Sequence, residues 1–364
     1  MKVMTVVGTR PEFIQIAPLT RSLRRRGHQE ILVNTGQHYD DNMSRVFFRE
    51  LDLPEPEISL GVGGGTHAEQ TGQMMIALEP VMLREKPDFV VVYGDTNSTI
   101  AGALTAAKLH MPIVHVEAGL RSFDRNMPEE INRVLTDHIS NILFSPTNVA
   151  VNNLKNEGVT SGVYNVGDVR TDVVLGIVPR ARERQAALLE SAGLQAGEAF
   201  ALATIHRASN TDSETRLRQI VDSFGAAEIP VLLPVHPRLR KMLDTFGLAF
   251  NDNVRTVEPL GFLDLIAALD ACEIVITDSG GLQKEAYMLR RPTITVRDTT
   301  EWIETVEAGW NRLCEPEPAA FLAAIQAARG DTPAEHPDFY GAEGVSDRMI
   351  DVLETALQKA AVTA

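Results

Sequence analysis

Short apolar runs recur along the whole chain, and a stretch with helical spacing follows each of them. Runs such as FVVVY at 89–93 and IVIT at 274–277 lack polar alternation, which is typical of strands covered on both faces. This alternation of strand and helix predicts parallel sheets built from right-handed βαβ units. The predicted strands cover residues 2–7, 30–35, 88–93, 112–116, 142–145, 163–166, 199–205, 230–234, 254–257, 273–277, 292–296 and 312–314.

The alternation starts again after Gly167, and a charged helical segment at 172–196 separates the two series of strands. The chain has 364 residues, more than the roughly 250–300 at which single cores stop growing. We therefore expect an α/β chain with two doubly wound parallel-sheet domains, at 1–168 and 169–345. A final helix is expected from Ser346, whose hydroxyl would cap it. A single large sheet is the alternative.

Composition and charge narrow the class of protein. A formal net charge of -15 argues against nucleic acid or an anionic membrane as a partner, because both are bound through Lys and Arg. The two cysteines, Cys272 and Cys314, cannot form a disulfide framework and indicate a reducing compartment. The N-terminal apolar run is too short for a signal peptide, and no run approaches the roughly 20 residues of a membrane helix. We therefore expect a cytoplasmic protein.

Polar residues follow the predicted strands at their carboxyl ends, where ligands bind in open parallel sheets. Their presence at the ends of both series of strands predicts a cleft between the two domains. These segments are GTRPE (8–12), TGQHYD (35–40), YGDT (93–96) and HVEAGLR (115–121) in the first half, and HR (206–207), HP (236–237), DSGG (278–281) and RD (297–298) in the second.

Single residues in these segments allow two interpretations each. Arg10 is either a surface charge or a phosphate clamp, and Asp95 either caps the next helix or serves a site. Glu117 ends a buried strand, where an unpartnered carboxylate is costly, so a functional role is favoured. Glu129 lies in an acidic first helical turn, which is ordinary helix chemistry. The nine histidines show no metal-ligand spacing, so no metal is expected.

Gly280 and Gly281 stand between a buried strand and a helix, and this is the best single signal for an anion. Glu285 follows one helical turn later, placed to accept ribose hydroxyls. His206 and His236 are either core histidines or ligands of the same site. The chain has neither G-x-G-x-x-G nor a P-loop, so the predicted ligand is a nucleoside diphosphate rather than a nicotinamide cofactor.

Taken in order over nearly the whole chain, eight motifs resemble those of the non-hydrolysing UDP-N-acetylglucosamine 2-epimerases. The resemblance implies the GT-B architecture, with two Rossmann-like domains facing a central cleft and a C-terminal helix (346–364) that packs back on the first domain. It also implies a homodimer. The motifs are GTRPE (8–12), GDTNST (94–99), HVEAGLRS (115–122), PEEINR (128–133), HR (206–207), PVHP (234–237), TDSGGLQKEA (277–286) and RDTTE (297–301).

The activity that this resemblance implies is the reversible conversion of UDP-N-acetylglucosamine to UDP-N-acetylmannosamine, for bacterial cell-surface polysaccharide precursors. Family members eliminate UDP to give 2-acetamidoglucal and then add it back, with no cofactor. Such a reaction needs a base and an acid at C2, and stabilisation of the leaving UDP. The implied catalytic residues are Asp95, Glu117, Glu129 and His206, and the choice of base stays open. The expected substrate-binding residues are Arg10, Gln15, His38, Arg121, Arg207, His236, Ser279, Gly280, Gly281, Glu285 and Arg297.

The chain also departs from the family pattern. Gln15 stands where many members have a lysine, HRASN (206–210) replaces HRREN, and TTEWIE (299–304) replaces TTERPE. Lys284 stands where an acidic residue is common, and TGQHYDDNM (35–43) lacks the form seen in members that UDP-N-acetylglucosamine activates. Allosteric activation is therefore left open. The alternatives are an epimerase of a related UDP-2,3-diacetamido sugar, a hydrolysing epimerase, a GT-B glycosyltransferase and a non-catalytic nucleotide-sugar sensor.

Overall fold

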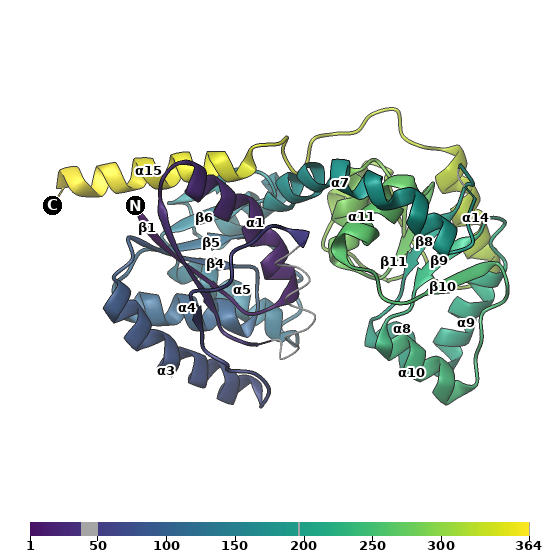
Figure 1. Ribbon diagram of the computed structural model, residues 1–364, viewed down its shortest axis with the longest axis horizontal. Helices are drawn as coiled ribbons and strands as arrows, with labels where there is room; N and C mark the ends of the chain where they lie inside the picture. The colour runs from purple at the N-terminus through teal and green to yellow at the C-terminus, as the bar shows by residue number, and fades with distance from the viewer. Residues whose placement is uncertain (38–49, 196, 364) are drawn as a thin grey trace. The chain divides into compact units, whose positions relative to one another are not determined.

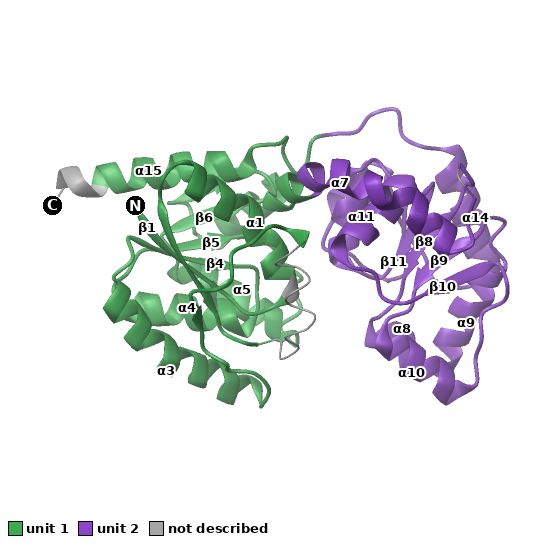
Figure 2. Cartoon of the chain, in the orientation of Figure 1, with its two compact units in different colours: residues 1–173, 338–364 green, residues 174–337 purple. Residues whose placement is uncertain are grey.

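The computed structural model describes residues 1–37, 50–195 and 197–363, which form two compact units (Figures 1 and 2). Unit 1 contains Met1–Val173 and Asp338–Ala364, and unit 2 contains Val174–Pro337. Each unit is built around one parallel sheet, as the alternating pattern predicts.

The sheet of unit 1 has seven strands in the order β3-β2-β1-β4-β5-β6-β7. The two-residue strand β3 (Ile58–Ser59) was not predicted, because two residues are too few to show a period. The other strands are β1 (Lys2–Val7), β2 (Gln29–Asn34), β4 (Phe89–Tyr93), β5 (Ile113–Val116), β6 (Ile142–Ser145) and β7 (Val163–Asn165). The helices are α1 (Arg10–Arg25), α3 (His67–Glu85), α4 (Asn97–Lys108), α5 (Pro128–Ile139), α6 (Asn148–Asn156) and α15 (Val345–Thr363), with the start of α7 (Val169–Ser191).

The sheet of unit 2 has six strands in the order β10-β9-β8-β11-β12-β13, which is the strand order of the Rossmann fold. Its strands are β8 (Ala201–Thr204), β9 (Val231–Pro234), β10 (Val254–Val257), β11 (Ile274–Thr277), β12 (Thr293–Thr295) and β13 (Asn311–Leu313). Its helices are α8 (Ala208–Thr211), α9 (Glu214–Gly225), α10 (Pro237–Phe246), α11 (Phe262–Ala271), α12 (Gly280–Met288), α13 (Ile303–Glu307) and α14 (Pro318–Gly330).

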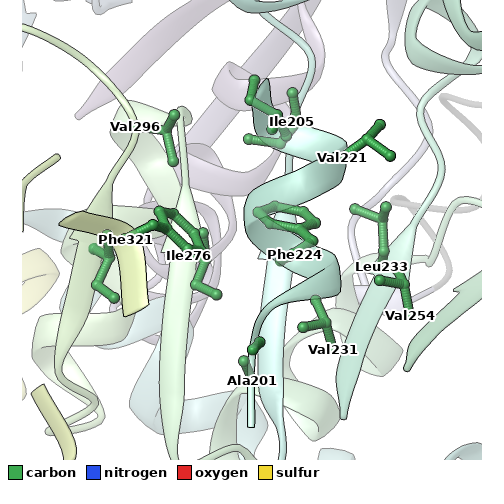
Figure 3. Packing of buried hydrophobic residues seen from close by; sticks show 14 of the residues in the cluster. Ala201, Ile205, Val221, Phe224, Val231, Leu233, Val254, Ile276, Val296 and Phe321 are labelled. Atoms are coloured by element: carbon green, nitrogen blue, oxygen red, sulfur yellow. The ribbon is translucent and has the colours of Figure 1, made fainter. Parts of the chain in front are cut away.

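The core of unit 2 shows why the central strand β11, with the sequence IVIT, lacks polar alternation (Figure 3). Phe224 of α9 and Phe321 of α14 are fully buried, with ring centroids 5.7 Å apart. They pack in one cluster with strand residues such as Ile276 and Leu233. Strands covered by helices need apolar side chains on both faces, so the prediction of buried strands is confirmed.

The C-terminal helix α15 packs on α1 within unit 1, where the hydroxyls of Ser22 and Ser346 lie 3.3 Å apart. Its first turn is capped by Asp172 of α7, whose carboxylate accepts the backbone N–H groups of Gly344, Val345 and Ser346. The Ser346 hydroxyl donates to the same carboxylate. The prediction that Ser346 caps this helix is therefore wrong, because a distant aspartate in the sequence supplies the acceptor.

In both units the strand order changes direction beside the first strand of the sheet, between β1 and β4 and between β8 and β11. Loops that leave neighbouring strands toward opposite faces open a crevice there, and ligands of open α/β sheets bind at such switch points. A ligand site is therefore expected at the turns after these four strands.

Candidate functional site

Glu12 joins the two turns at the switch point of unit 1. It is 2% exposed and accepts the backbone N–H groups of Gly8 and Thr9, at 2.7 and 2.8 Å, after β1. It also accepts the hydroxyl of Thr96 after β4, at 2.6 Å. Burial raises the pKa of Glu12, and these hydrogen bonds oppose the rise. The candidate list from the sequence missed Glu12, although its place three residues after Thr9 is a capping-box signal.

Asp95 follows Gly94 in the turn after β4 and forms an ion pair with Arg133 of α5. Thr96, not Asp95, is the N-cap of α4, so the interpretation of Asp95 as a helix cap is wrong. Burial raises the pKa of Asp95; Arg133 opposes this rise, and the charges of Glu117 and Glu129 add to it. The predicted carboxylates are therefore close enough to affect one another.

Glu117 lies just beyond β5 in a left-handed backbone conformation, with φ 72. Its Oε2 atom accepts the side-chain N–H of Gln15 at 2.7 Å. A Cβ atom built on Gly94 would lie 3.6 Å from the same oxygen, which places the carboxylate against the turn that carries Asp95. Gln15 is 3% exposed, so its buried amide is one of the groups that hold the Glu117 carboxylate in place.

A pocket of about 220 Å³ opens at this switch point, and Asp95 and Glu129 line it together. It is smaller than the roughly 300–1,000 Å³ of complete ligand sites, so it fits one part of a larger ligand. Asn132 of α5 also lines the pocket and donates to the backbone carbonyl of Asp95 at 3.0 Å. The other lining residues are Thr9, Pro11, Gln37, His67, Thr96, Asn97 and Pro128.

Asp278 organises the switch point of unit 2. It is fully buried at the end of β11 and accepts the backbone N–H groups of His206 and Arg207 and the amide of Asn210, each at 3.0 Å. Its carboxylate also lies 3.0 Å from Nδ1 of His206. Burial acts to raise the pKa of Asp278, but His206 and the N–H donors outweigh burial and lower it. The candidate list missed Asp278, although the quoted DSGG segment contains it.

His206 is oriented by this contact. Its side chain is 40% exposed, so it is not a buried core histidine. With Nδ1 toward Asp278, the other ring nitrogen remains available to a ligand. The ring of His236, also exposed, lies 5.7 Å from that of His206 between centroids. The two predicted histidines therefore lie side by side.

Helix α12 begins at the two glycines, as predicted, and Ser279 is its N-cap. Within the described parts of the chain, no acceptor takes the backbone N–H of Gly280 or Gly281. Such free N–H groups at a helix N-terminus attract an anion. Glu285 lies on the same helix and is 3% exposed.

Arg297 makes a two-point ion pair with Glu301, at 2.9 Å for both contacts. Burial acts to raise the pKa of Glu301, but Arg297, with a smaller contribution from Arg207, lowers it. A Cβ atom on Gly280 would lie 3.6 Å from Oε2 of Glu301. Two predicted arginines thus lie near the start of α12, with one carboxylate between them and the glycines.

Arg121 is buried, with its guanidinium bonded to Asp137 and Glu157 at 2.7 Å. His38 lies outside the described residues, and so does the side chain of Arg10. The assignments of Arg121, His38 and Arg10 as substrate-binding residues stay predictions.

No group of three or more His, Cys, Asp or Glu side chains among the described residues is placed to hold a metal ion. No helix in the same part of the chain is long and apolar enough to cross a membrane.

Residues 21–354 match the model of the family described as UDP-N-acetylglucosamine 2-epimerase. A Methanococcus maripaludis protein, a UDP-N-acetylglucosamine 2-epimerase homolog, is 50% identical over 97% of this chain and 99% of its own. The UDP-2,3-diacetamido-2,3-dideoxy-D-glucuronate 2-epimerase of Pseudomonas aeruginosa is 44% identical over the same shares, 97% and 99%.

Among solved structures, the chain is similar to Methanocaldococcus jannaschii UDP-GlcNAc 2-epimerase in complex with UDP-GlcNAc and UDP. The TM-score is 0.86 at 42% identity, and the match covers 98% of this chain and 100% of the other. The chain belongs to the UDP-N-acetylglucosamine 2-epimerase family. The predicted family and the predicted GT-B fold class, two Rossmann-like parallel-sheet domains, are both confirmed.

Proposed function

We propose that this enzyme inverts C2 of a UDP-N-acetylated sugar by eliminating and re-adding UDP. A carboxylate takes the C2 proton, the C1–O bond breaks with its electrons going to UDP, and a C1=C2 double bond forms. Return of a proton to the opposite face of C2, with UDP bonding again at C1, gives the epimer. The reaction is internal to one substrate and consumes no cofactor.

The grouping of Asp95, Glu117 and Glu129 carries this proposal. An acid with a raised pKa holds its proton better near neutral pH, while a neighbouring carboxylate stays ionised, and such a pair divides acid and base roles. Burial raises the pKa of Asp95, and the other two carboxylates add to that rise. One of these three carboxylates takes the C2 proton, and a different carboxyl group of the set returns one from the other face.

Unit 2 supplies the groups that suit UDP. The free N–H groups at the start of α12 bind phosphate oxygens, and Glu285 is placed on the same helix for the ribose. Asp278 orients His206 through a contact of 3.0 Å to Nδ1. As an imidazolium, His206 donates from its other ring nitrogen to the diphosphate while negative charge grows on the leaving UDP. Preorganised donors aimed at developing charge lower the barrier to bond breaking.

The identity of the sugar in the UDP-sugar substrate has two candidates. UDP-N-acetylglucosamine is the first choice, because the UDP-GlcNAc 2-epimerase of Methanocaldococcus jannaschii is 42% identical in the structural match. The second is a UDP-2,3-diacetamido uronic acid, the sugar named for the Pseudomonas aeruginosa relative at 44% identity. Incubating the protein with each UDP-sugar and separating the products by ion-exchange chromatography tests the choice. The preferred substrate is expected to reach a fixed ratio of two epimers.

The same assay separates the alternatives. A hydrolysing epimerase accumulates UDP and free sugar, and a GT-B glycosyltransferase consumes the UDP-sugar only when an acceptor is added. A nucleotide-sugar sensor binds both compounds and converts neither. Any of these three results would contradict the proposed reaction. We further propose that the product serves cell-surface polysaccharide synthesis in the cytoplasm.

We also propose that the enzyme is a homodimer. Two helices of unit 1 that both pack against α4 expose large apolar side chains: Ile76 and Leu83 on α3, and Ile131 and Leu135 on α5. A second copy of the chain would cover such surface, and exposed apolar patches commonly mark interfaces. Light scattering is expected to give twice the chain mass of 39.9 kDa. A monomer mass would contradict the proposal.

A further inference from the structure

His115 is a fully buried histidine that the proposed reaction does not use directly. It lies on β5, and its Nδ1 atom is 2.7 Å from a carboxylate oxygen of Asp137 on α5. Its Nε2 atom is 2.7 Å from the backbone carbonyl oxygen of Gly94, in the turn after β4. Both ring nitrogens thus have close oxygen partners.

Those two oxygens decide the protonation of the ring. A backbone carbonyl can only accept a hydrogen bond, and an ionised carboxylate can only accept one. The other oxygen of Asp137 accepts from the N–H of Gly119 at 3.1 Å and from Arg121 at 2.7 Å. Burial acts to raise the pKa of Asp137, but His115 and Arg121 lower it below its ordinary value. With Asp137 ionised, both nitrogens of His115 must donate.

The surrounding charges balance a positive ring. Arg121 bonds to Asp137 and also to Glu157, at 2.7 Å through its Nε atom. A charged His115 completes a group of two cations and two carboxylates. A buried charge is tolerated when it is paired and hydrogen-bonded in this way.

The ring also connects the two turns that carry the proposed catalytic carboxylates. Gly94, whose carbonyl it holds, precedes Asp95 directly and has the left-handed φ of 60. Glu117 follows His115 by two residues and also has a left-handed backbone. We infer that His115 is a buried imidazolium that acts as a positioning residue, fixing the turns of Asp95 and Glu117. The catalytic part of this inference rests on the proposed function.

Nitrogen NMR of the full protein tests the charge without any assay of activity. At pH about 7.5, a histidine with the ordinary pKa of about 6.5 is mostly neutral and shows one nitrogen in the unprotonated range. His115 is expected to show both nitrogens in the protonated range, with its signals identified by their absence in His115→Gln. An unprotonated nitrogen at His115 would overturn the inference.

Kinetics test the positioning. In His115→Gln, one side-chain amide cannot donate to both oxygens at their present places, so the turns are expected to shift. We expect kcat to fall by on the order of tenfold to 100-fold, because a small misplacement of the reacting groups slows the chemical step. KM and UDP affinity are expected to stay unchanged. His28→Gln is the matched control, because His28 pairs with Glu354 at 2.8 Å on a different part of unit 1. Unchanged kcat in folded His115→Gln, or equal losses in both variants, would overturn the positioning role.

The two proposals fail in different ways. If the wild-type protein converts no UDP-sugar, the proposed function fails and the positioning role fails with it. The NMR measurement still decides whether His115 is an imidazolium. If the wild-type protein is active and His115 has an unprotonated nitrogen, only the present inference fails.

Discussion

At the scale of single residues, the carboxylates at the end of the unit 1 sheet differ in their surroundings. Asp95 pairs with the cation of Arg133, whereas Glu117 is held by the neutral amide of Gln15 at 2.7 Å. The positive charge of Arg133 also acts on Glu117, and a nearby cation favours the charged form of a carboxylate. The proposed division of acid and base roles therefore rests on burial, which raises the pKa of Asp95.

Asp95→Asn and Glu117→Gln test the assignment of these carboxylates. Each change keeps the shape of the side chain and removes its ability to take up or release a proton as a general base or acid. The rate of C2 proton exchange is expected to fall by about 10²–10⁴-fold, and UDP affinity is expected to stay near normal. Asp252→Asn, the same change on an exposed loop of unit 2, is the control. Near-normal exchange in both active-site variants would contradict the assignment.

Arg133→Met tests the charge balance at Asp95. The arginine opposes the rise in the pKa of Asp95 that burial causes, so its removal raises that pKa further. A higher pKa means that Asp95 gains its proton at a higher pH as the solution is acidified. The limb of the pH–rate profile that Asp95 controls is therefore expected to move to higher pH. Arg125→Met, on an exposed loop, should leave both limbs in place, and an unmoved profile in Arg133→Met would refute the coupling.

At the scale of elements, the start of α12 is the proposed phosphate site. Gly281→Asp adds a negative charge where the free N–H groups face a phosphate. A helix N-terminus stabilises an anion by up to about 2 kcal/mol, so UDP affinity is expected to fall at least about tenfold by calorimetry. Gly176→Asp adds the same charge to an exposed position of α7 with open space around it. Equal UDP affinity in the two variants would rule out a phosphate site at the start of α12.

The capping of α15 by Asp172 is a second test at this scale. Asp172→Ala leaves three backbone N–H groups and the Ser346 hydroxyl without their shared acceptor. The free energy of opening α15, measured by hydrogen exchange, is expected to fall by about 2–3 kcal/mol. Asp347→Ala removes an exposed ion pair with Arg25 and should cost less than about 1 kcal/mol. Similar decreases in the free energy of opening α15 in both variants would show that Asp172 does not stabilise this helix as its N-terminal cap.

Most helices and strands were predictable from the sequence. The side-chain hydrogen bonds that join them to one another were not. Continuous apolar runs reveal buried strands, and Gly280 and Gly281 mark the start of α12, because these signals are local. The roles of Asp172, Glu12 and Asp278 depend on partners that folding brings together from distant positions. The sequence predicts Gln15 as a substrate-binding residue but does not reveal that its amide donates to Glu117.

At the scale of the whole molecule, each unit supplies one part of the proposed chemistry. The carboxylates belong to unit 1, and the groups suited to UDP belong to unit 2. Both sets stand at the switch point of their own sheet, because parallel strands present their carboxyl ends on one edge. The reaction requires both sets to act on one substrate molecule. Removing either set should therefore abolish turnover, while the nucleotide remains bound only when the unit 2 set is intact.

Proton NMR of UDP-N-acetylglucosamine with the enzyme in D2O tests the central claim most directly. Elimination and re-addition must break the C2–H bond, so the account predicts loss of the C2 proton signal. UDP-N-acetylmannosamine carrying deuterium at C2 should appear until a fixed ratio is reached, and the UDP-2,3-diacetamido uronic acid is measured in parallel. Retention of the C2 proton in both compounds, with no epimer formed, would contradict the proposed reaction.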